Sequence, residues 1–125
     1  MLLENEFRKI LENVIVVGDH VERLRGFIKM SQLASHALVQ LKSATYSGTT
    51  LLMQAAKLGR VSCVSVLIDE YEANVNVQSE GNQDTALHFA SRNGHIQVIQ
   101  ALLQRGADRS LRNKLGQIVE INLNP

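Results

Sequence analysis

The sequence predicts an all-α solenoid, in which short helix pairs repeat along the chain and stack on one another. The first observation is an internal repeat: the chain matches itself when Gly59 is aligned with Gly94, an offset of 35 residues, and such a period is typical of stacked repeats. The second is the helical spacing of the apolar residues around each glycine. The third is that proline occurs only at Pro125, so residues 1–125 read as a single domain. Positions that match include Thr50 and Thr85, Leu52 and Leu87, Ala55 and Ala90, Val64 and Ile99, and Leu67 and Leu102.

Residues 5–28 are interpreted as a degenerate capping repeat at the N-terminus. Leu11 and Val14 precede Gly18 by the same numbers of residues as Leu87 and Ala90 precede Gly94. A stack of this kind needs at least about three units to bury a continuous core. Two clear copies therefore require this third one. The apolar residues of its second helix, shifted by one position, are Leu24, Phe27 and Ile28.

The segment 29–47 is longer than the later connection in the chain. It accounts for most of the 22 residues from Ile28 to Thr50, compared with 15 from Leu103 to Ile118. Two interpretations remain open: an extra helical turn or long loop that covers the first groove, and an insertion that binds a partner. The apolar residues at helical spacing are Leu33, Ala37, Leu38 and Leu41.

Residues 48–78 and 79–111 are the two clear copies, each predicted to be a pair of short helices. In the second copy, Thr85 is the expected N-cap, because its hydroxyl can accept from free N–H groups of the first turn. Gly94 supplies the positive φ that ends the first helix, and Gly106 ends the second. The second helix carries an apolar stripe of Ile96, Ile99, Leu102 and Leu103.

The stretch "DTALHFASRNGHIQVIQALLQRGAD" resembles an ankyrin repeat, with the family's elements in the right order and spacing. The stretch "GTTLLMQAAKLGRVSCVSVLIDEYEANVN" is similar but looser, since Met53 and Arg60 stand where the family favours histidine and Tyr71-Glu72 replaces a glycine. The match covers about 48–113. The resemblance implies antiparallel helix pairs, β-turn loops projecting to one side, and a function in binding other proteins.

Residues 112–125 are expected to be a partial repeat or a tail. "RNKLGQ" looks like the turn that opens another repeat, but Ile118-Val119-Glu120-Ile121 replaces the expected helix start. Eight residues follow Gln117, too few for a full repeat. Either the terminus is divergent or the chain is cut from something longer.

No catalytic, metal or cofactor site is predicted. His88 and His95 lie across a predicted helix break, without the further ligands at short spacing that a zinc site needs. The resemblance assigns them structural work, such as bridging backbone groups of adjacent loops. Cys63, the only cysteine, reads as a small core residue and suits an intracellular protein, cytoplasmic or nuclear.

The net charge of +1 gives no electrostatic reason to expect nucleic acid as the main partner. The longest fully apolar run, Val14 to Val17, is far shorter than the ~20 residues that span a bilayer, so no membrane insertion is expected. One local cluster of cations is expected to form a solvated face rather than a functional basic patch. Its members are Arg105, Arg109, Arg112 and Lys114.

The expected binding surface comprises the loop tips and the outer face of each first helix, whose side chains stay outside the core. Val16 and Val17 fall on the same face, unless 29–47 buries them; both interpretations remain open. The predicted partner-binding residues are Tyr46, Ser47, Thr49, Lys57, Leu58, Asn82, Asp84, Arg92, Asn93, Lys114, Leu115 and Gln117.

The leading hypothesis is a non-enzymatic protein–protein interaction module that binds another protein through its loop tips and concave helix face. The alternative is a regulatory or targeting fragment of a larger enzyme or assembly, such as a ubiquitin-ligase substrate adaptor. In both cases the scaffold is set by the fold and the partner by the surface residues.

Overall fold

The structure, a computed structural model, describes residues 2–119 and consists there of helices and connecting loops. The all-α prediction is confirmed: within these residues the only extended pairing is an isolated bridge between Ser43 and Thr49. Met1 and residues 120–125, which include part of the predicted partial repeat, lie outside the described residues. The helices are α1 (Leu2–Ile10), its π-helical continuation η1 (Leu11–Ile15), α2 (Val21–Met30), α3 (Ser35–Gln40), the short 3-10 turn η2 (Ala44–Tyr46), α4 (Leu51–Lys57), α5 (Val61–Asp69), α6 (Ala86–Arg92) and α7 (Ile96–Gln104).

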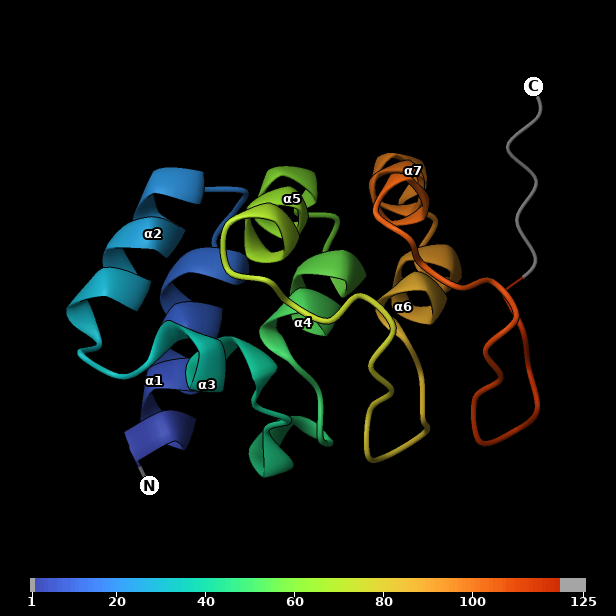
Figure 1. Cartoon of the computed structure of the whole chain (residues 1–125), viewed down its shortest axis with the longest axis horizontal. Coiled ribbons are helices and arrows are strands. Elements are labelled where there is room, and N and C mark those ends of the chain that lie inside the picture. Colours follow the sequence, from blue (N-terminus) through green and yellow to red (C-terminus); the bar gives the residue numbers. More distant parts are fainter. Residues whose placement is uncertain (1, 120–125) are drawn as a thin grey trace.

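Three helix pairs stack side by side to form the solenoid. One layer contains α1 with η1, α4 and α6, and the other contains α2, α5 and α7 (Figure 1). The connecting loops project from the side of the stack that lies away from the second layer (Figure 1). Contacts within each pair and between neighbouring first helices, above all α4 with α6, hold the layers together.

The helix boundaries follow from capping groups and glycines, as predicted. Thr85 Oγ1 accepts the His88 backbone N–H at 3.3 Å, and His88 Nδ1 in turn accepts the Thr85 backbone N–H at 3.0 Å. Thr50 caps α4 through its hydroxyl alone, which accepts the backbone N–H of Met53 at 3.2 Å. Gly59 and Gly94 have φ of +77° and +72°, a left-handed conformation that favours glycine and ends the first helix of the second and third pairs.

Apolar side chains from every helix pair merge into one core. Cys63 is fully buried within it, as expected of a small core residue, and burial, followed by the neighbouring Asp19 carboxylate, raises the pKa of its thiol to about 12. The largest fully buried side chains include Phe7, Ile10, Leu24, Leu51, Leu67, Leu87 and Leu102.

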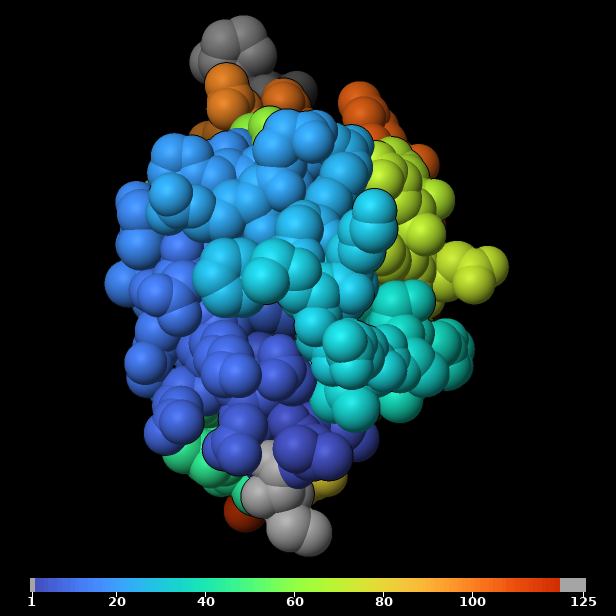
Figure 2. Space-filling model, turned by 90° about the vertical axis from the view of Figure 1, so that its left-hand side faces the viewer, coloured from blue at the N-terminus to red at the C-terminus, as the bar shows by residue number. Residues whose placement is uncertain are grey.

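Segment 29–47 contains the short helix α3, which agrees with the extra helical turn of the first interpretation; the binding of a partner by this segment stays a prediction. Leu38 and Val39 of α3 are buried against α1 and α4, and Gln40 hydrogen-bonds to the backbone of the next pair's connection at Glu72 and Asn74. Seen from the N-terminal end, α1, α2 and α3 cover the end of the stack (Figure 2). The helix therefore extends the core at this end.

The residue after each turn glycine links neighbouring pairs. Arg60 donates from Nε to the Ile15 carbonyl at 2.8 Å and from Nη2 to the Val16 carbonyl at 3.1 Å. His95, at the equivalent position, lies with Nε2 3.0 Å from the Lys57 carbonyl. Both side chains thus satisfy carbonyl groups at the C-terminal end of the preceding first helix, which have no partner within the helix. Arg60 can stand where the resemblance favours histidine, because one of the carbonyls it binds, that of Val16, is at the position equivalent to Lys57.

Asp19 forms a further link, because its carboxylate caps a helix of the next pair. Its oxygens accept the backbone N–H groups of Ser62 at 2.9 Å and Cys63 at 2.8 Å, in the first turn of α5. Partial burial raises the pKa of Asp19, but these hydrogen bonds together lower it by more than burial raises it. The pKa of Asp19 therefore lies below its ordinary value. The charged carboxylate is therefore the stabilising form.

We expect Asp19→Ala to lower the free energy of unfolding by about 0.5–2 kcal/mol at neutral pH, the usual effect of losing an N-cap. Because the folded-state pKa is depressed, this stabilisation is present above the unfolded-state pKa and disappears as the pH falls through the folded-state pKa. Urea unfolding at neutral pH and below pH ~3 measures the difference between wild type and variant. An unchanged difference at low pH would contradict this role. Glu80→Ala, which removes an exposed carboxylate from a loop, is the control.

Candidate functional site

Two adjoining hollows form a groove along the loop side of the first helices. The first hollow, of about 420 Å³, lies between the first and second pairs, and the second, of about 250 Å³, lies between the second and third. They share Tyr46, Ser47, Gln54 and Lys57, and are therefore continuous. The first is completed by Leu11, Val16, Thr45 and Leu58, and the second by Thr49, Ser79, Gly81, Asn82, Asp84, Phe89 and Arg92.

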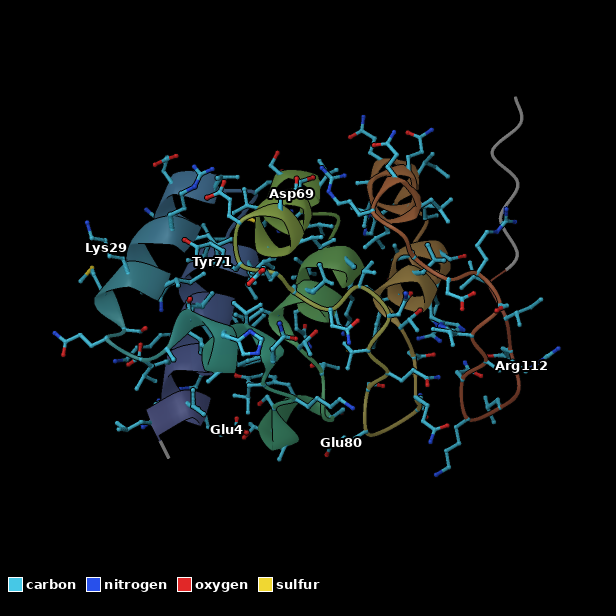
Figure 3. All side chains as sticks on the ribbon, in the orientation of Figure 1. Glu4, Lys29, Asp69, Tyr71, Glu80 and Arg112 are labelled. Carbon is cyan, nitrogen blue, oxygen red and sulfur yellow. The ribbon has the colours of Figure 1, made fainter. Side chains whose placement is uncertain are left out.

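The structure places most of the predicted residues on this groove or at the tips of the projecting loops. Lys57 and Arg92 are the last residues of α4 and α6 and reach into the groove from equivalent positions. Tyr46 and Leu58 are half-buried in its walls. Figure 3 shows this loop side: Arg112 marks the last projecting loop, and Asp69, at the end of α5 in the second layer, lies on the opposite side of the stack. The exposed members of the predicted set are Ser47, Lys57, Asn82, Arg92, Asn93, Lys114, Leu115 and Gln117.

The expectation that all these side chains are free is wrong for Asp84, which is 1% exposed. Its Oδ1 accepts from Arg92 Nη2 at 3.1 Å and from Asn113 Nδ2 at 3.0 Å. Its carbonyl accepts the N–H of Ser79 at 2.8 Å, which folds the loop back on itself. Asp84 therefore holds the loop, the following connection and Arg92 in place.

The same expectation is wrong for Thr49, which is 4% exposed. Its hydroxyl donates to the Tyr46 carbonyl at 2.7 Å and accepts from Gln54 Nε2 at 2.9 Å. These bonds close the turn that carries Tyr46. Thr49 thus contributes to the groove by positioning its neighbours.

Val16 and Val17 are 53% and 55% exposed, which decides between the two open interpretations. Segment 29–47 leaves both valines uncovered, and Val16 lines the first hollow. The ring of Tyr46 completes this apolar end, with its Oη 3.4 Å from Glu12 and its face stacked on Phe7 at a centroid distance of 5.6 Å.

Sequence reasoning missed Gln54 and Phe89, which form part of the groove floor. Both lie five residues before their turn glycine, at equivalent positions of α4 and α6. The same register that selected Lys57 and Arg92 could have found them. Phe89 also lies beneath the Arg92 guanidinium, 5.7 Å from ring centroid to Cζ.

The two histidines singled out by the sequence make structural hydrogen bonds, as predicted. His88 Nδ1 accepts from Thr85, so its Nε2 carries the proton and donates to the Gln117 carbonyl at 3.0 Å, bridging to the next loop. His95 binds the preceding pair through Lys57. Within residues 2–119, no three His, Cys, Asp or Glu side chains are grouped so that they could hold a metal ion.

A third hollow, of about 580 Å³, lies beyond α6 and is lined by Arg92 and by residues of the final connection, including Arg112 and Val119. None of the helices between residues 2 and 119 has the length and apolar character needed to cross a membrane.

Comparison of the sequence with known families shows which family the chain belongs to. The sequence matches the family model for ankyrin repeats, in three copies, over residues 20–113. The chain belongs to the ankyrin-repeat family. Ankyrin repeats are in general modules for protein–protein interaction, and the helix pairs and projecting loops described above agree with this family's architecture.

The chain is similar to the ankyrin-repeat parts of larger proteins. It is 42% identical over 67 residues to ankyrin repeat domain-containing protein 40 of Mus musculus, covering 54% of this chain and 18% of that protein. It is 38% identical over 97 residues to ankyrin repeat and SAM domain-containing protein 6 of Rattus norvegicus (78% and 11%). It is 37% identical over 96 residues to ankyrin repeat and SOCS box protein 2 of Bos taurus (77% and 14%). The chain thus spans less than a fifth of the length of these relatives.

Proposed function

We propose that the chain is a non-enzymatic interaction module that binds a segment of a partner protein along the groove. The observation that carries the proposal is the continuity of the two hollows, which share Tyr46 and Lys57 and run from the first helix pair to the third. A concave surface formed by successive repeats is the usual binding surface of such solenoids. Family membership supports the same class of function.

The groove also has the character expected of a binding surface. The exposed Val16 and the half-buried Tyr46 and Leu58 offer apolar area at one end. The exposed Lys57, where the two hollows meet, and Arg92, at the other end, offer charge. Aromatic and arginine side chains in concave positions are those that most often dominate binding energy.

We expect Lys57→Ala and Arg92→Ala each to weaken binding of the partner by about tenfold or more, the effect typical of a residue that matters in an interface. Affinity purification from the source cell followed by mass spectrometry identifies the partner, and titration calorimetry with the purified partner measures the loss. Circular dichroism checks that each variant is folded. Arg109→Ala is the matched control, because Arg109 is exposed and lines neither hollow. Unchanged binding by both groove variants would count against this surface.

A second candidate function is a regulatory or targeting unit within a larger assembly, such as a ubiquitin-ligase substrate adaptor. It is supported by the similarity to ankyrin repeat and SOCS box protein 2, a relative whose name places a further element beside its repeats, and by the small share of each relative that this chain spans. Mapping the full-length transcript and testing for ubiquitin-ligase subunits among the copurifying proteins would decide. A transcript that encodes no more than these residues would remove the support.

A further inference from the structure

We propose that the groove selects an extended acidic peptide segment, in which an aspartate or glutamate lies beside a bulky apolar residue. The carboxylate would be held between Lys57 and Arg92, and the apolar side chain would fill the first hollow. This inference rests on the proposed function and names the chemistry of the partner.

The charge along the groove changes in a regular way. Val16, Lys57 and Arg92 occupy the same position in the three pairs, two residues before the glycine or its equivalent, Gly18 in the first pair. The groove is therefore apolar at the first pair and cationic at the second and third, although the whole chain carries a net charge of only +1.

The one carboxylate among the lining side chains, Asp84, forms an ion pair with Arg92 and so offsets only one of the two cations, which leaves the charge of Lys57. Asp84 is buried and already accepts from Arg92 and Asn113. The exposed Glu80 lies on the loop tip against Gly48 and is not part of either lining. The groove thus presents positive charge to an incoming chain, which favours a carboxylate at this place.

Arg92 is held in a conformation ready for such a ligand. Its guanidinium lies over the Phe89 ring and donates one Nη2 hydrogen bond to Asp84, while its side chain remains 49% exposed. A guanidinium has five N–H donors, so donors remain for a carboxylate, and a fixed planar fork suits the bidentate geometry of that group. Less conformational freedom is then lost on binding.

The other end of the groove determines where the apolar side chain of the peptide would bind. Leu11, Val16, Tyr46 and Leu58 line the first hollow, and the nearby Glu12 carboxylate lies within 3.4 Å of Tyr46 Oη. An acidic side chain would be repelled here and attracted towards Lys57, whereas an apolar one gains from burial. A nucleic acid, with charge along its whole length, fits this gradient less well than a peptide does.

A test selects binders from a phage library of random twelve-residue peptides, using the full chain as bait. We expect enriched peptides to carry Asp or Glu next to Leu, Ile or Phe, and to bind at least tenfold more weakly when the acid is replaced by its amide. Lys57→Glu should reverse the preference towards basic peptides, whereas Arg109→Glu, an equal charge change outside the groove, should leave it unchanged. Binding of the selected acidic peptides should weaken as NaCl rises.

The outcomes separate this inference from the function on which it depends. Peptides that lose binding with Val16→Asp but show no acidic preference would overturn the inference and leave a binding groove in place. Peptides indifferent to Val16→Asp, Lys57→Glu and Arg92→Gln alike would overturn both. Tight, Lys57-dependent binding of a single-stranded DNA 20-mer, in the absence of acidic peptides, would overturn the inference in favour of nucleic acid. Circular dichroism of every variant excludes unfolding as the cause.

Discussion

Replacing Phe7 by alanine should lower the free energy of unfolding by about 3–5 kcal/mol, the usual effect of removing a buried aromatic side chain. Phe7 is fully buried in α1 and its ring stacks on Tyr46, so the substitution leaves a cavity between the first helix pair and the turn that carries Tyr46. Because small domains are stable by only about 5–15 kcal/mol, this single change removes a large fraction of the total. Chemical denaturation followed by circular dichroism measures it.

The Phe7 variant also tests whether the first pair is essential to the stack. Leu2→Ala, in the same helix but at a position that is 71% exposed, should change stability by less than about 0.5 kcal/mol and serves as the control. A single cooperative transition at lower denaturant is expected, since the three pairs share one core. Retention of wild-type stability by the Phe7 variant would show that α1 adds little to the fold.

The parts of this structure that depend on local signals could be predicted from the sequence. Thr85 caps its helix and Gly94 ends it because a hydroxyl at an N-cap and a positive φ at a helix end are requirements of a few neighbouring residues. The apolar stripes are likewise local, with a period set by helix geometry. Alignment of the copies then placed Lys57 and Arg92 on one face, which the structure confirms.

The parts that depend on distant partners could not be predicted. Asp84 looked like an exposed loop residue, but its partner Asn113 lies 29 residues further along the chain, in the next loop. Segment 29–47 leaves Val16 uncovered because Leu38 and Val39 pack against α1 and α4 instead. No spacing within either segment indicates these contacts, since they arise only when the pairs stack.

Gly59→Ala should destabilise the protein more than the equivalent Gly94→Ala, although both glycines have nearly the same positive φ. A left-handed conformation costs a residue with a Cβ about 1–2 kcal/mol, and this is all that Gly94→Ala should lose, because no atom lies within 4 Å of the position its Cβ would take. At Gly59 the added Cβ would come within 2.7 Å of His95 Nδ1, so the ring must move. We expect a loss of roughly 2–4 kcal/mol once the hydrogen bond of His95 is included.

A double-mutant cycle shows whether the excess arises from this contact between pairs. In His95→Ala the hydrogen bond to the Lys57 carbonyl is already absent and the ring that the new Cβ would strike is gone. Adding Gly59→Ala to that variant should therefore cost only the conformational part, about 1–2 kcal/mol, and the two substitutions should be clearly non-additive. Additive losses would mean that His95 does not couple the second and third pairs. Non-additivity would show that glycine is needed at position 59 for two reasons, the turn of its own pair and the side chain that the next pair places against it.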